Sequence, residues 1–152
     1  MFAVIRIRGT VGVRREIEDT LKMLRLKAKH NCVLVPEKPD FLGMLQKVKD
    51  YVTWGEIDKE TLVELLKKRL RARGERRVDE NLLKELTGYD SFEKFAEDLL
   101  NQKVKLKDFE NLKPVFRLTP PSKGFKNIKE HWPKGDLGYR GKEINELLRR
   151  MI

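Results

Sequence analysis

The stretch "VIRIRGTVGVRREIEDTLKMLRLKAKHNCVLVP", from Val4 to Pro36, decides how the chain begins to fold. Residues 2–8 alternate between two faces, which predicts a strand with one face buried and the other, which carries Arg6, partly solvated. Apolar residues then recur at helical spacing from residue 13 to residue 24. Residues 32–36 have the composition of a short buried strand.

The next segment repeats this order of elements. Pro39 suits the first turn of a helix, and residues 51–57 are typical of a third strand that Gly55 weakens. Residues 1–58 therefore predict the order strand, helix, strand, helix, strand, which is typical of a compact α/β unit. The periodicity predicts ten buried residues: Ile5, Ile7, Ile17, Leu21, Leu24, Val33, Val35, Phe41, Leu45 and Val48.

The rest of the chain divides into two parts. Residues 59–112 predict a helical lobe, in which a helix capped by Asp58 stops at Gly74, a short helix spans 79–88, and a capping box at Asp90 opens a third. Residues 113–152 predict an extended basic segment. It contains one short strand near residues 115–118 and ends in a helix over 144–151.

Charge gives the first indication of a partner. The 152 residues include 34 Lys+Arg and 24 Asp+Glu, and the net charge of +10 points to nucleic acid or an acidic membrane. Residues 1–31 carry eight cations and three anions, and residues 113–152 carry ten and four. If these two ends meet in space, they form one basic face.

The sequence lacks the motifs that are typical of several classes of function. The Walker and G-x-G-x-x-G patterns are absent, and the two histidines, His30 and His131, have no metal-ligand spacing, so we expect no catalytic residue, metal or cofactor. The lone Cys32 indicates a reducing compartment and an inert core thiol. Because no run of about 18 apolar residues and no signal peptide is present, we expect a cytoplasmic protein. The many Lys and Glu beside only two Gln are typical of a heat-loving source.

Two segments have the chemistry of phosphate binding. In "RGTVGVRRE", Arg8 to Glu16, free N–H groups and glycines at a helix start can receive a phosphate, although a plain turn with solvated arginines is the alternative. In "FRLTPPSKGFKN", residues 116–127, two prolines stiffen the backbone among three cations. Phe125 there can stack on a base or pack on its own domain. We expect residues 113–141 to be loosely held until RNA binds.

From Phe2 to Ile57 the chain resembles ribosomal protein thirty of the large subunit, on "TLKMLRLKAKHNCVLVP" followed by "GMLQKVKDYV". The lobe, "FRLTPPSKGFK" and "INELL" are similar to the longer archaeal branch, whose eukaryotic counterpart is large-subunit protein seven. The resemblance implies an α+β fold for residues 1–58, with a small three-stranded sheet related to the ferredoxin-like fold and two helices on one face, and it implies no catalysis. It also implies binding to large-subunit (23S-type) ribosomal RNA near the 5S RNA and central protuberance, with 5S RNA and neighbouring ribosomal proteins as further partners, as a monomer within the ribosome.

The candidate RNA-binding residues combine the resemblance with the charge pattern. Leu42 replaces an arginine that family members often carry, and Lys47 is expected to take over part of that contact. The full set is Arg8, Thr10, Val11, Gly12, Arg14, Arg15, Lys27, Lys29, His30, Asn31, Lys47, Arg117, Lys123, Gly124 and Lys126.

The sequence thus favours a structural constituent of the archaeal large ribosomal subunit. The alternatives are a free RNA-binding module or RNA chaperone, and a small enzyme that acts on RNA.

Overall fold

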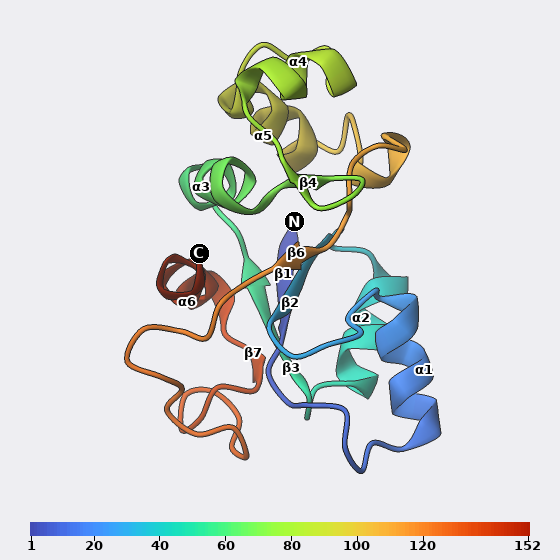
Figure 1. The fold of residues 1–152 in the computed structure, drawn as a ribbon. Coiled ribbons are helices and arrows are strands. Elements are labelled where there is room, and N and C mark those ends of the chain that lie inside the picture. The colour runs from blue at the N-terminus through green and yellow to red at the C-terminus, as the bar shows by residue number, and fades with distance from the viewer.

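The computed structural model describes residues 1–152 and centres on a five-stranded sheet of order β6-β2-β1-β3-β7 (Figure 1). The long strands are β1 (Phe2–Arg6), β2 (Asn31–Val35) and β3 (Val52–Glu56), and β1 pairs antiparallel with both neighbours. The edges are β6 (Phe116–Arg117) and β7 (Gly138–Tyr139), of two residues each. The predicted three-stranded sheet is confirmed, and the C-terminal segment extends it at both edges.

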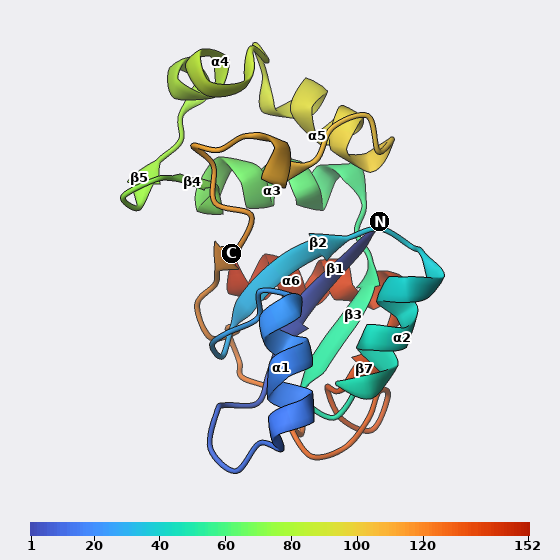
Figure 2. The ribbon, with the colours of Figure 1, turned by 90° about the vertical axis from the view of Figure 1, so that its right-hand side faces the viewer.

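Two helices cover one face of the sheet, as predicted (Figure 2). Leu21 of α1 (Arg15–Met23) and Leu45 of α2 (Pro39–Lys47) pack in a buried cluster with Val4 and Trp54 of the strands. Eight of the ten residues predicted to be buried are buried. The exceptions, Ile17 and Phe41, are half-buried because they lie at the border of this cluster.

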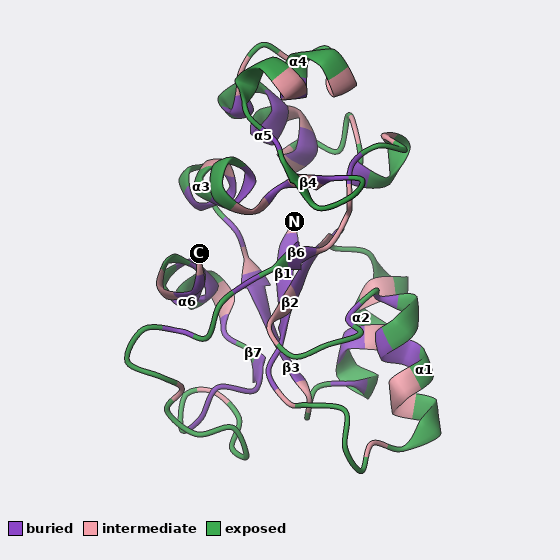
Figure 3. Ribbon diagram, in the orientation of Figure 1, coloured by how far each residue is buried: buried purple, intermediate pink, exposed green.

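The strand face that was expected to be partly solvated, which carries Val4 and Arg6, is the face that α1 and α2 cover, and this corrects the expectation. Helices α6 (Ile144–Met151) and α3 (Lys59–Arg69) pack on the opposite face, where Ala3 and Ile5 lie, so all of β1 is buried (Figure 3). Arg6 is only 1% exposed. Its guanidinium is not solvated because it donates hydrogen bonds to the carbonyl oxygens of Leu26 (2.7 Å), Arg8 (2.9 Å) and Gly9 (3.0 Å).

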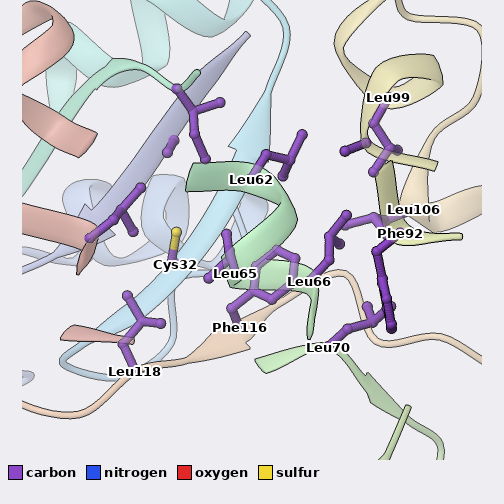
Figure 4. Packing of buried hydrophobic residues seen from close by; sticks show 14 of the residues in the cluster. Cys32, Leu62, Leu65, Leu66, Leu70, Phe92, Leu99, Leu106, Phe116 and Leu118 are labelled. Carbon is purple, nitrogen blue, oxygen red and sulfur yellow. The ribbon is translucent and has the colours of Figure 1, made fainter. Parts of the chain in front are cut away.

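The helical lobe shares its core with the sheet. In Figure 4 Leu62, Leu65 and Leu66 of α3 lie between Cys32 of the sheet and Leu99 of the lobe, within one cluster of 23 buried residues. This cluster includes α5 (Phe92–Leu100) and Leu83 of α4 (Glu80–Thr87), and the 3-10 turn η1 (Leu106–Asp108) closes the lobe. Burial of these leucines therefore stabilises both parts together.

The helix boundaries confirm two predicted caps and correct two other predictions. Asp58 and Asp79 accept hydrogen bonds from backbone N–H groups in the first turns of α3 and α4, and Gly88 ends α4 in the left-handed conformation. Helix α5 is capped by Ser91 rather than Asp90, because the serine Oγ accepts from the Lys94 N–H.

Helix α3 ends at Arg69, before the predicted stop at Gly74. A hairpin of β4 (Arg71–Ala72) and β5 (Arg76–Arg77) follows, and Gly74, with φ of 79°, lies in its turn. The chain leaves the helix early because Leu70 adopts an extended conformation while its side chain stays buried.

The C-terminal segment has more structure than its composition predicts. The strand expected near residues 115–118 is present as β6, whereas β7 and the 3-10 turn η2 (Gly141–Glu143) were not foreseen. Asp136 and Arg140 form a buried ion pair of 3.1 Å, and the Asp136 carboxylate also accepts the N–H groups of Lys126 and Asn127. No helix is both long and apolar enough to cross a membrane.

Candidate nucleic-acid interface

The two basic ends of the chain meet at one edge of the sheet. Strand β6 pairs antiparallel with β2, which sets Arg117 opposite Asn31. The Leu118 N–H extends the contact by donating to the His30 carbonyl at 3.2 Å. The basic turn at residues 27–31 and the segment that begins at residue 113 therefore form a continuous surface.

An open cleft of about 800 Å³ lies on this surface. It is bounded by the end of α1, the turn before β2, the β4–β5 hairpin and the residues leading into β6. Seven cations line it: Lys22, Arg25, Lys27, Lys29, Arg71, Lys113 and Arg117. Such a concentration of one charge in a hollow attracts a polyanion.

Glu75 is the one acid in the lining of the cleft. It pairs with Lys113, and Arg117 lies 3.5 Å from the same carboxylate oxygen. The hydrogen bond from Lys113, with the charges of Arg117 and Arg71, holds the pKa of the Glu75 carboxyl below its usual range. Glu75 therefore stays ionised and fixes two cations, and the cleft remains strongly positive.

The loop after β1 extends into solvent. Thr10, Val11 and Gly12 are exposed, Val11 at 97%, and Arg14 and Arg15 are exposed at the start of α1. Arg14 stands at the N-cap without a side-chain cap. Two acids, Glu16 and Glu18, share the first turn, so the arginines oppose the helix dipole less than their sequence position suggests. Arg8 lies 5.2 Å from the centre of the Tyr51 ring.

His30 connects the two basic ends rather than standing free. Its ring is half-buried and stacks on Phe125, with centroids 5.9 Å apart and planes at 15°. Burial, with a smaller contribution from Lys29, lowers the pKa of His30. The ring is therefore neutral at pH 7, and Phe125 packs on its own domain.

The remaining candidates lie around the cleft or away from it. Lys123, Gly124 and Lys126 are exposed on the segment that follows β6, where Arg150 donates to the Gly124 carbonyl at 3.1 Å. Lys27 and Lys29 line the cleft, as do Asn31 and Arg117. Lys47, at the end of α2, is exposed but does not line it.

Sequence reasoning missed four cations of the cleft: Lys22, Arg25, Arg71 and Lys113. The sequence "KKRLRAR" at residues 67–73 carries a signal for Arg71, but its cations also suit a helix C-terminus. Only the folded chain brings these four residues together. The structure contains no group of His, Cys, Asp and Glu arranged to hold a metal ion.

Comparisons with known proteins identify the family of the chain. A family model described as ribosomal protein L30p/L7e matches residues 2–52. A protein of Archaeoglobus fulgidus named large ribosomal subunit protein uL30 is 56% identical over 151 residues, which cover 99% of each chain. Proteins of the same name from Methanosphaera stadtmanae (49% over 153 residues, all of each chain) and Methanopyrus kandleri (51% over 149 residues, 96% of this chain and all of the relative) are also similar. With such identity over its whole length, the chain belongs to the uL30 family of large-subunit ribosomal proteins, described in the family model as L30p/L7e.

Proposed function

We propose that the protein is a structural constituent of the archaeal large ribosomal subunit and that it binds large-subunit ribosomal RNA across the basic cleft. The observation that carries this proposal is the cleft itself, in which seven cations from four separate segments face a single, already paired acid. Lys and Arg in such an arrangement neutralise phosphates and release counterions, which supplies affinity without any chemical step. Membership of a family of structural ribosomal proteins makes the chain a structural protein rather than an enzyme.

The RNA is held by a rigid surface rather than by a flexible tail. β-sheet pairing fixes Arg117 beside the turn that carries Lys27 and Lys29, so a docking RNA strand need not order these backbones first. The exposed loop at residues 9–15 supplies a second contact, and the exposed Lys123 and Lys126 supply a third. Family resemblance supports a position near the 5S RNA and the central protuberance, with 5S RNA and neighbouring proteins as further partners in the cytoplasmic ribosome.

Co-sedimentation tests this function against the alternative of a transient RNA-binding module. The protein is mixed with archaeal large subunits that lack it, and the particles are washed with increasing salt before centrifugation. A ribosomal constituent stays with the particles through a high-salt wash. Complete release at modest salt, with equal binding to unrelated RNA, would favour the free RNA-binding module or chaperone.

A further inference from the structure

We propose that the β4–β5 hairpin is a second RNA-binding arm and that through it the helical lobe docks on ribosomal RNA rather than on a protein. This inference rests on the proposed function. It assigns a partner to the lobe, which lies beyond residues 2–52, the part of the chain that the family model matches.

The lobe is divided into halves of opposite charge. Residues 67–77, the end of α3 and the hairpin, contain seven cations and only one acid, Glu75. Residues 78–101, which include α4 and α5, contain seven acids and two cations. The whole lobe, residues 59–112, carries 13 cations and 12 acids, and this near neutrality conceals the division. An RNA strand is attracted to the hairpin and repelled by the helical pair, so charge alone sets the orientation of the lobe.

Three arginines of the hairpin have no partner within the protein. Arg73, Arg76 and Arg77 are exposed, and none of their guanidinium groups makes a hydrogen bond or an ion pair. The neighbouring Arg71, in contrast, donates to the carbonyls of Lys68 and Leu70. Four arginines within seven residues repel one another, and an external polyanion relieves that repulsion.

The hairpin is held firmly enough to act as an arm. Ala72 and Val78 are buried beneath it, and the Arg73 N–H donates to the Asn111 carbonyl at 2.9 Å. The Lys113 N–H donates to the Arg71 carbonyl, also at 2.9 Å. Because Glu75 is occupied by Lys113 and Arg117, the one acid of the turn does not neutralise the free arginines.

The arm points toward the same side of the molecule as the proposed interface. In Figure 2 the hairpin projects on the side where the turn before β2 and the loop after β1 also lie. Arg71 and Glu75 line the cleft, so the hairpin forms one wall of it and extends the positive surface onto the lobe. A bound RNA backbone can therefore continue from the cleft along Arg73, Arg76 and Arg77, whose planar guanidinium groups match phosphate oxygens.

Directed cleavage of RNA tests the position of the arm. An iron chelate that generates hydroxyl radicals is attached to an Arg76→Cys variant, with Glu85→Cys on the acidic face of α4 as the matched control. Native Cys32 is fully buried and does not interfere. In reconstituted large subunits we expect ribosomal RNA to be cut from position 76 and not from position 85. Equal cutting of the RNA from both positions would overturn the inference. The inference would also be overturned if position 76 cut no RNA and the hairpin crosslinked to a neighbouring protein in the same particles.

Affinity for purified archaeal large-subunit RNA gives a second, independent readout. Replacing Arg73, Arg76 and Arg77 by Gln should make the dependence of log affinity on log salt shallower by about 2 to 3. Replacement by Lys should largely retain it. The control replaces Lys94, Lys103 and Lys142, which are exposed and unpaired, by Gln and should leave the slope nearly unchanged. A wild-type slope in the arginine-to-glutamine variant would refute the arm alone, whereas no binding by the unaltered protein would overturn the proposed function and the arm with it.

Discussion

Arg6 and Arg140 are the two buried cations, and Arg6 fixes the backbone beside the proposed interface. Arg6 joins the beginning of the loop after β1 to the turn after α1 through the carbonyls of Gly9 and Leu26. Burial lowers the pKa of Arg6, and the charges of Glu18 and Tyr51 partly offset this decrease. A sequence pattern treats a strand arginine as solvated. Its burial depends on carbonyls that only the tertiary fold supplies, so it could not be predicted.

Replacing Arg6 by Met should therefore destabilise the protein strongly. The buried Leu26 carbonyl and the part-buried Arg8 and Gly9 carbonyls lose their donor, and we expect the free energy of unfolding in urea to fall by about 2–5 kcal/mol. Arg14→Met, at an exposed site on the same loop, is the control and should change it by less than about 0.5 kcal/mol. Equal small effects in both variants would mean that Arg6 is not a structural donor.

Cys32 gives a prediction for pH dependence. Full burial raises the pKa of its thiol from 9.0 to about 12, so the folded protein keeps a proton that the unfolded chain releases. The stability linked to this thiol is complete below pH 9 and is lost as the pH rises toward 12. Urea unfolding curves at pH 8, 9 and 10 should show a steeper loss for the wild type than for Cys32→Ala. Parallel losses in the two proteins would contradict the burial of the thiol.

At the scale of elements, η2 lies against the backbone of β3 at Gly55. A Cβ atom added at Gly55 would lie 1.9 Å from the Gly141 carbonyl oxygen, which is why a glycine interrupts this strand. Sequence reasoning recognised the weakened strand but not its cause, because η2 lies more than 80 residues away in the chain. The helices and their caps were easier to predict, since periodicity and capping residues are local.

Gly55→Ala should destabilise the protein, because the backbone of η2 must move aside. We expect a loss of about 1–3 kcal/mol in the free energy of unfolding. Gly43 lies in α2 with open space around its Cα, so Gly43→Ala should be neutral or stabilise by up to about 1 kcal/mol. The same thermal or urea measurement serves both variants. A neutral Gly55→Ala would show that η2 does not pack as described.

The loop at residues 126–136 depends on one buried carboxylate. Asp136 accepts from the N–H groups of Lys126 and Asn127 while it pairs with Arg140. In Asp136→Ala we expect amide hydrogen exchange at residues 126 and 127 to accelerate at least tenfold, with core strands unchanged. Unaltered exchange rates at these two amides would show that the Asp136 carboxylate does not hold the loop in place.

At the scale of the whole molecule, the proposed RNA-binding surface forms because the two basic ends of the chain meet. The charge surplus at residues 1–31 and 113–152 is visible in the sequence, and so is the condition that the ends must meet to form one basic face. The pairing of β6 with β2 fulfils that condition. The part that the lobe plays in RNA binding could not be predicted from its net charge. That net charge is nearly zero because a positively charged hairpin and a negatively charged pair of helices offset each other.

The salt dependence of RNA binding tests the central claim most directly. Lys27, Lys29 and Arg117 are replaced together by Gln, and affinity for archaeal large-subunit RNA is measured by filter binding from low to high salt. If each side chain neutralises one phosphate in the shared cleft, the slope of log affinity against log salt becomes shallower by about 2 to 3, while the melting temperature stays nearly constant. A slope and affinity equal to those of the wild type would contradict the account, since the two chain ends would then not form a common RNA-binding surface.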